Sequence, residues 1–147
     1  MKERKLKNVF KQGAIPPDFI ATAIANHQSK TNIGAHDIFL GQVRADTFGD
    51  KTVTAIEYTA HESMANQVFH ELREATFEKF DLSCMHIYHS LGKVRAGEIC
   101  FFVFVSGAHR KEVFDALEYL VEDIKAKVPI FGKEIFEDST HQWKVNN

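Results

Sequence analysis

The sequence lacks the long apolar segments that would assign it to a membrane. Its longest apolar run, ICFFVFV at residues 99–105, is far shorter than the ~20 residues that span a bilayer. The basic start of the chain, MKERKLKNVF, is not followed by an apolar block of signal-peptide length. These absences predict a protein that does not enter a membrane and stays in the cytoplasm.

Cysteine is also scarce, with only Cys84 and Cys100 in 147 residues. Neither belongs to a CxxC pair or to another spacing typical of a metal site. In a reducing cytoplasm, isolated cysteines of this kind are most often buried free thiols. We therefore expect two buried thiols rather than a disulfide or a catalytic nucleophile.

Strong net charge is absent as well. The formal net charge is −2 with histidine neutral, which gives no indication of general nucleic-acid binding, although a local basic pocket stays possible. The chain has no GxGxxG, no phosphate-cradling glycine-rich loop and no Ser-His-Asp arrangement. His86 and His89 are three residues apart on an expected strand, so they should face opposite sides and cannot share one metal ion. The sequence thus predicts no metal site.

What the chain does contain is the composition and length of one globular domain, residues 1–147, with 44% hydrophobic and 26% charged residues. Apolar residues at helical spacing predict three helices, a short one starting at Pro16-Pro17 and two long ones. Alternating or continuous apolar runs predict the strands. The expected helices cover residues 17–26, 61–80 and 109–127, and the expected strands cover residues 5–12, 34–45, 52–59, 85–91, 99–105, 130–136 and 141–145.

The order of these elements predicts an α+β fold, because the regular βαβ alternation of a doubly wound sheet is missing. We expect the strands at 34–45 and 52–59 to form a hairpin across the turn DTFGD. The segment GKVRAG at residues 92–97 should end the strand before it. The strand at 99–105 should lie in the centre of the sheet.

Three boundaries between elements carry cations. Gln42-Val43-Arg44 ends a strand, His109-Arg110 starts a helix, and Lys125 and Lys133 flank Pro129. The positive end of a helix disfavours a cation, so Arg110 suggests a bound anion that offsets this clash. The alternative is that Arg110 points into solvent or pairs with an acid. Lys125 could likewise hold its amine in a cleft or simply be a favourable cation at a helix C-terminus.

Five fragments in order resemble the large, catalytic subunit of molybdopterin synthase. They are FLGQVR (39–44), IEYTAHESMA (56–65), HSLGKV (89–94), GAHR (107–110) and KAKVPIFGKE (125–134). The resemblance extends over roughly residues 34–143. It implies an α/β hammerhead fold, with an antiparallel or mixed sheet, two long helices and a short N-terminal helix.

The resemblance also implies an activity. The large subunit would form a homodimer, and each copy would bind a small ubiquitin-like sulfur-carrier subunit, giving a heterotetramer. Sulfur would pass from the carrier's C-terminal thiocarboxylate to cyclic pyranopterin monophosphate, without a metal or organic cofactor in the large subunit. Both ligands are anions that repel each other, so their common site needs fixed cations.

Transferred position by position, the resemblance predicts the site residues. Lys125, Lys133 and Arg44 are the expected catalytic residues. The expected substrate-binding residues are Gln42, Val43, Arg44, His109, Arg110, Lys125, Lys133 and Glu134. Lys125 is the strongest candidate, in contact with the carrier tail or a covalent tail–substrate intermediate.

Some positions depart from the family pattern. Gly132 stands where the family has a second catalytic lysine, Phe131 replaces its tryptophan, and Ser90 replaces a frequent arginine. Lys133 could take over only if a bulge or a positive φ at Gly132 turned it into the site, since a one-residue shift in a strand reverses the face. Two other functions therefore stay open: a non-catalytic module that binds a carrier tail or phosphorylated ligand, and an unrelated dimeric α+β sensor with an anion site.

Overall fold

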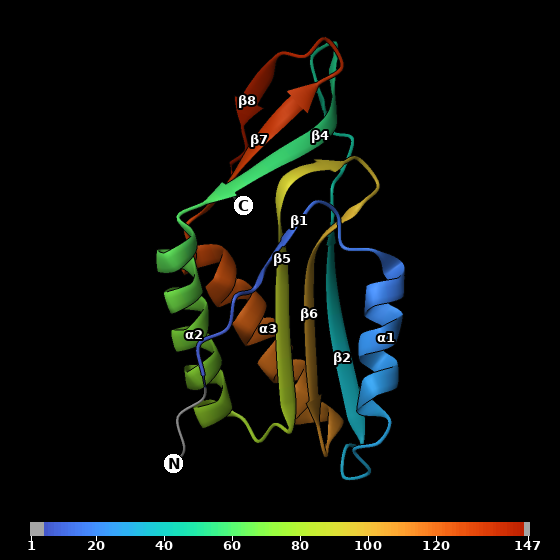
Figure 1. Ribbon diagram of the computed structural model, residues 1–147, viewed down its shortest axis with the longest axis vertical. Coiled ribbons are helices and arrows are strands. Elements are labelled where there is room, and N and C mark those ends of the chain that lie inside the picture. Colours follow the sequence, from blue (N-terminus) through green and yellow to red (C-terminus); the bar gives the residue numbers. More distant parts are fainter. Residues whose placement is uncertain (1–4, 146–147) are drawn as a thin grey trace.

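The computed structural model describes residues 5–145, which fold into a long mixed sheet covered by three helices (Figure 1). The helices are α1 (Pro17–His27), α2 (Glu62–Lys79) and α3 (Arg110–Lys127). The strands are β1 (Phe10–Gln12), β2 (Ala35–Gln42), β3 (Thr47–Phe48), β4 (Lys51–Ala60), β5 (Cys84–Arg95), β6 (Ile99–Gly107), β7 (Ile130–Phe136) and β8 (His141–Trp143). The predicted α+β class with two long helices and a short first helix is confirmed.

The strands pair in the order β2-β6-β5-β4-β7-β8, with β1 parallel to β5 and β3 beside β4. The predicted hairpin between residues 34–45 and 52–59 is wrong. β2 pairs antiparallel with β6, whereas β4 pairs with β5 and β7. The DTFGD turn joins only the two-residue strand β3 to the start of β4. β2 therefore lies beside the interior strand β6.

β5 does not end where the sequence predicted. Residues 84–89 pair with β6, and residues 92–95 pair with β4. Gly92 begins the second half with a φ of 83°, a conformation that glycine adopts without steric cost. The strand therefore bends at Gly92 and changes its partner, and the turn follows at residues 96–98. This bend connects the lower part of the sheet to β4, β7 and β8 (Figure 1).

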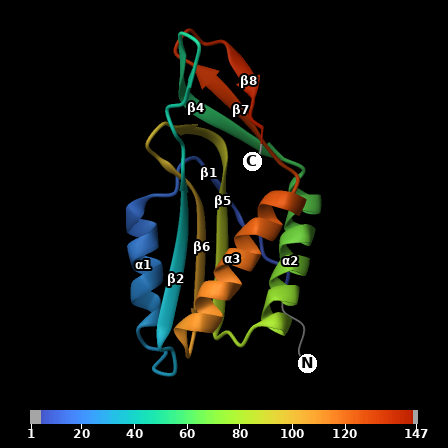
Figure 2. The ribbon, with the colours of Figure 1, turned by 180° about the vertical axis from the view of Figure 1, so that it is seen from behind.

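β6 is buried on both faces, which explains its continuous apolar sequence. Phe101, Val103 and Val105 belong to the main core beneath α2 and α3. Phe102 and Phe104 alternate with them and pack with Ile15 and Ile20 on the side covered by α1. Figure 2 shows α3 lying across one face of the sheet beside α2, with α1 behind. Within residues 5–145 no helix is long and apolar enough to cross a membrane.

The remaining boundaries lie close to the predicted ones. The last strand, expected at 141–145, ends at Trp143, and the first, expected at 5–12, is limited to Phe10–Gln12. α3 ends at Lys127 because Pro129 follows: proline lacks the N–H and biases the preceding residue, Val128, to extended geometry. α3 therefore ends shortly before β7, and Lys125 in its last turn lines the cavity described next.

Candidate functional site

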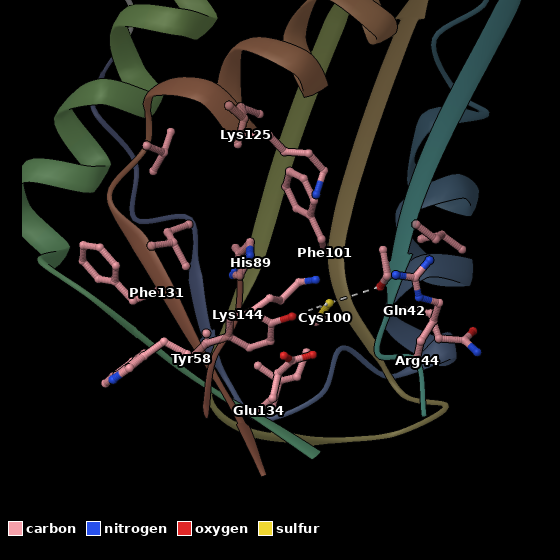
Figure 3. Close-up of a pocket in the computed structure, with 18 of the residues that line it drawn as sticks. Gln42, Arg44, Tyr58, His89, Cys100, Phe101, Lys125, Phe131, Glu134 and Lys144 are labelled. Carbon is pink, nitrogen blue, oxygen red and sulfur yellow. Dashed lines mark hydrogen bonds between the residues drawn. The ribbon is translucent and has the colours of Figure 1, made fainter. Parts of the chain in front are cut away.

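A cavity of about 900 Å³ lies where the end of α3 meets β2, β6 and the β4-β7 region (Figure 3). Its polar lining includes Gln42, Arg44, Asp46, Tyr58, His89, Cys100, Lys125, Glu134 and Lys144. Its apolar lining includes Phe39, Leu40, Ile56, Phe101, Ile124, Val128, Ile130, Phe131 and Trp143. The cavity thus combines cations with aromatic and aliphatic walls. Two of the three cation-bearing boundaries in the sequence contribute to it, through Arg44 after β2 and Lys125 at the end of α3.

Arg44 contributes a cation that already has a partner. Its Nε lies 3.1 Å from Asp46 Oδ1, and its terminal nitrogen donates to Asp46 Oδ2 at 3.3 Å. The Arg44 side chain is 77% exposed, so the pair is well solvated and contributes little to stability. A planar guanidinium binds carboxylate or phosphate through two parallel hydrogen bonds. Arg44 can therefore exchange Asp46 for an anionic ligand at little cost.

Lys125 reaches the cavity from the last turn of α3. Its Nζ lies 5.8 Å from the centroid of the Phe101 ring, which forms part of the wall. The neighbouring Lys127, two residues further along, instead lies 3.6 Å from Asp123 Oδ2 and is not part of the lining. Of the two alternatives raised for Lys125, the structure shows the lysine at a cavity, whereas Lys127 is an ordinary solvated helix-end cation.

Lys133 does not line the cavity. Gly132 pairs with Tyr58 and Lys133 with Glu57 in regular register, and Gly132 does not have a positive φ. The bulge that would have turned Lys133 inward is therefore not present. Lys133 points to the other face of β7, where its Nζ lies 3.2 Å from Glu57 Oε1. The two flanking residues on β7, Gly132 and Glu134, face the cavity instead.

Lys144 supplies the cation that β7 does not. Its N–H donates to the Gly132 carbonyl at 2.8 Å, so it follows β8 directly beside Gly132. A side chain at position 132 would point toward it, since a Cβ built there lies 3.6 Å from the Lys144 Cβ. Lys144 therefore occupies the same face of the sheet as position 132 and lines the cavity (Figure 3). Sequence reasoning missed Lys144, because only the β7-β8 pairing relates it to Gly132.

Neutral polar groups form the floor. The Tyr58 hydroxyl donates to Cys100 Sγ at 3.4 Å, and that thiol donates to the Gly41 carbonyl at 3.5 Å. Burial raises the pKa of Cys100, and it raises the pKa of Tyr58 far above its ordinary value, with Cys100 and Glu134 adding to the effect. Cys84 and Cys100 are the buried free thiols that the sequence predicted.

His89 lies in the same floor and is held neutral. Burial lowers its pKa from 6.5 to about 4, and Lys125 adds to the lowering, while the bond to the Ser90 carbonyl opposes it. Since a carbonyl can only accept, the 2.8 Å contact means that Nδ1 carries the proton. His86 points to the opposite side of the sheet, against Phe104, as the sequence predicted.

Besides Lys133, three expected binding residues lie away from this cavity. Val43 is 1% exposed and belongs to the core. His109 and Arg110 are exposed at the start of α3, His109 as the N-cap. Fifteen residues separate Arg110 from Lys125, or about 22 Å along the helix. Arg110 and Lys125 therefore cannot meet at one ligand within a single copy of the chain.

The geometry accommodates an anionic ligand with an apolar body. Arg44, Lys125 and Lys144 come from three separate parts of the chain and offer positive charge beside aromatic walls and the phenol, thiol and imidazole groups of the floor (Figure 3). A family model described as the MoaE protein matches residues 16–127 of the sequence. The chain belongs to the MoaE family.

Relatives of this MoaE chain carry a consistent name. A molybdopterin synthase catalytic subunit of Bacillus subtilis is 40% identical over 114 residues, covering 78% of this chain and 71% of the relative. One of Emericella nidulans is 34% identical over 125 residues, covering 85% and 64%. The chain spans only 56% to 66% of the length of the relatives from Emericella nidulans, Rattus norvegicus and Aspergillus fumigatus.

Solved structures share the whole MoaE fold seen here. Molybdopterin synthase from Staphylococcus aureus superposes with a TM-score of 0.79 at 28% identity, covering 99% of this chain and 98% of that one. A complex of subunits 1 and 2 of molybdopterin-converting factor from Helicobacter pylori gives a TM-score of 0.78 at 22% identity, covering 91% and 87%. At that identity the second match establishes the fold alone.

Proposed function

We propose that this MoaE chain is the sulfur-transferring large subunit of a molybdopterin synthase. The observation that carries the proposal is the cavity in which Arg44, Lys125 and Lys144 face aromatic walls in a chain of this family. The donor is the thiocarboxylate at the C-terminus of a small ubiquitin-like carrier, and the acceptor is cyclic pyranopterin monophosphate. Two buried free thiols are consistent with a reaction in the reducing cytoplasm.

In the proposed reaction, the anionic thiocarboxylate attacks the pterin close to the anionic phosphate. The thiocarboxylate sulfur forms a bond to a carbon of the pterin side chain as a carbon–oxygen bond at that carbon breaks, and the departing oxygen takes up a proton. Water then cleaves the acyl–sulfur bond. The sulfur stays on the pterin, and the tail leaves as a carboxylate. Fixed cations lower the barrier by offsetting the repulsion between tail and phosphate and by stabilising charge that develops in the transition state.

Each cation has a separate role in this proposal. Arg44 holds the phosphate in place of Asp46, because its fork matches two phosphate oxygens. Lys125, beside Phe101, stabilises the tail and the acyl intermediate and exchanges protons with it. Lys144 takes the role that the family assigns to the position of Gly132, since it presents its amine from the same face.

The carrier would dock over the aromatic rim of the cavity. Phe131 and Trp143 both line the cavity, yet they are 54% and 60% exposed. Exposed aromatic side chains beside a pocket are typical of protein interfaces. A flexible C-terminal tail can then extend from the docked carrier between them to Lys125.

A homodimer would supply the remaining cations. Because Arg110 lies about 22 Å along α3 from Lys125, His109 and Arg110 can serve this reaction only at the cavity of a second copy. Mixing Lys125→Ala and Arg110→Ala chains tests this arrangement: if each site combines both residues from different copies, mixed dimers regain one intact site while either parent alone stays inactive. Absence of any regain would show that the two residues do not act in a shared site.

Reconstitution with thiocarboxylated carrier and cyclic pyranopterin monophosphate tests the function. Lys125→Ala should abolish molybdopterin formation while carrier binding persists. Lys127→Ala is the matched control, because it removes a lysine from the same helical turn but outside the cavity. Normal turnover by Lys125→Ala would exclude the proposed mechanism.

The same assay decides the second candidate, a non-catalytic binding module. The glycine at position 132 and the outward direction of Lys133 favour it, because they remove one lysine from β7. Tight carrier binding by the wild-type chain with no product, under conditions in which a Bacillus subtilis synthase turns over, would establish the module instead.

A further inference from the structure

A second group of chemically reactive side chains lies on the other face of the sheet, below α1. It consists of His27 at the end of α1 and of Cys84 and His86 at the start of β5. Their ligand-type atoms, two imidazole nitrogens and one sulfur, all lie within 4.8 Å of one another. His27 and Cys84 are buried, and His86 is partly buried. The proposed sulfur-transfer mechanism uses none of them.

The two imidazoles are oriented with their Nε2 atoms toward each other, 2.9 Å apart. His27 Nδ1 lies 2.7 Å from the Ala23 carbonyl, which can only accept, so this nitrogen carries the proton. In neutral His27 the Nε2 lone pair is therefore free to face His86, which is the tautomer that a metal ligand needs. The carbonyl of Ala23 is the kind of partner that fixes a ligating histidine.

The sulfur is already engaged by a positive charge. Lys30, in the turn after α1, donates from Nζ to Cys84 Sγ at 3.0 Å. Lys30 is an exposed residue, so its long side chain can swing into solvent without disturbing the core. The Cys84 sulfur thus accepts a hydrogen bond from a cationic donor that can move away.

We propose that His27, Cys84 and His86 form a zinc site that joins the end of α1 to β5. Zinc prefers tetrahedral nitrogen and sulfur ligands at about 2.0–2.1 Å and 2.3 Å. These bond lengths place two ligand nitrogens about 3.4 Å apart and nitrogen and sulfur about 3.6 Å apart, which is within the spread of the cluster. A water molecule completes the four ligands. On binding, the Cys84 thiol loses its proton to solvent, and the His86 proton moves from Nε2 to Nδ1.

Charged residues surround the proposed zinc site. Three cations, Lys7, Arg73 and Lys30, act electrostatically on His86. The same three cations repel Zn²⁺, so the Cys84 thiolate is essential and Lys30 must leave when the ion arrives.

The proposed ion would lie apart from the cavity. His86 and His89 point to opposite faces of β5, and only His89 lines the cavity. Zinc would therefore not touch the reacting groups and would act by holding α1 against β5. Its expected effect is on stability: an excess of zinc of about a hundred times its dissociation constant should raise Tm by about 8 °C in a chain of this size.

Calorimetry and thermal unfolding of the reduced, metal-stripped full chain test the site, with ZnCl₂ as the titrant. One equivalent should bind and release about one proton, seen as a dependence of the binding heat on the buffer. His27→Gln and Cys84→Ala should each weaken binding by more than the 10- to 100-fold that second-shell changes cost. His141→Ala, an exposed histidine, and Cys100→Ser, a buried thiol on the other face, are matched controls that should keep it.

Lys30→Met provides the decisive variant, since it leaves all three ligands in place and folds without a new buried group. It should bind zinc more tightly than the wild type, because the competing ammonium is gone. Cobalt substitution should give the thiolate-to-metal absorption of a tetrahedral site, lost in Cys84→Ala. Absence of stoichiometric binding at millimolar zinc, unchanged affinity in the ligand variants, or no gain in Lys30→Met would overturn the proposal.

Discussion

The roles of Lys133 and Lys144 can be separated by parallel substitutions. The two lysines lie on neighbouring strands, but Lys133 pairs with Glu57 on the outer face and Lys144 lines the cavity. Lys133→Ala removes an ion pair whose side chains are 30% and 42% exposed, which is worth about 0.2–1 kcal/mol of stability. We expect its turnover to change by less than about 3-fold, because its charge is partly cancelled and points away from the substrate.

The effect of Lys144→Ala follows from the size of the cavity. A sphere with the cavity's volume of about 900 Å³ has a radius of about 6 Å, so a charge on its wall lies about that far from a ligand at its centre. At an effective dielectric constant of about 20, one charge at that distance is worth about 2.8 kcal/mol. If this energy is gained mainly in the transition state, Lys144→Ala should slow sulfur transfer about 100-fold.

Single-turnover formation of molybdopterin from pre-thiocarboxylated carrier is the appropriate measurement, because it separates the chemical step from carrier recharging. Lys144→Arg should recover a large part of the rate, since it restores the charge but not the shape. Thermal unfolding of each variant controls for misfolding. A greater loss in Lys133→Ala than in Lys144→Ala would refute the assignment of the second cavity lysine.

Three further outcomes follow from the structure. The pKa of His89 is about 4 in the folded chain and ordinarily 6.5, so the unfolded chain binds the extra proton at a higher pH than the folded chain does. The free energy of unfolding should therefore fall by about 3 kcal/mol as the pH drops from 6.5 to 4, which urea unfolding measures. Cys100→Ser should keep sulfur transfer within about 10-fold, since burial holds the thiol neutral and a poor nucleophile; a complete loss with a normal Tm would show that this sulfur participates. Gly132→Ala should cost about 1–3 kcal/mol, because its Cβ would lie 3.0 Å from the buried Ile56; an unchanged denaturation midpoint would contradict that packing.

The sequence was sufficient where local periodicity decides the structure. The stripes of α2 and α3 predicted those helices almost to the residue, and the apolar run at 99–105 predicted an interior strand. It was insufficient for strand pairing, because the turn DTFGD indicates a hairpin regardless of which strand β2 finally joins. β2, residues 35–42, pairs with β6, which lies far along the chain, and no local signal encodes that choice.

For the candidate site, too, the sequence predicted some residues and missed others. Arg44 and Lys125 could be named from the sequence because each lies within a recognisable fragment. Lys144 could not, since its relation to Gly132 exists only through the β7-β8 pairing. His27 and His86 are 59 residues apart and belong to different elements, so their contact also appears only after folding.

The Arg44–Asp46 pair influences which anions Arg44 holds and which it releases. A spent tail bears a carboxylate, and swapping one carboxylate for another brings Arg44 no net gain. A cyclic phosphodiester carries one negative charge and gains no more, whereas a ring-opened phosphate monoester carries nearly two and binds the same fork more strongly. If the chain transfers sulfur as proposed, this internal competitor would release the spent carrier and hold a pterin whose phosphate ring has opened.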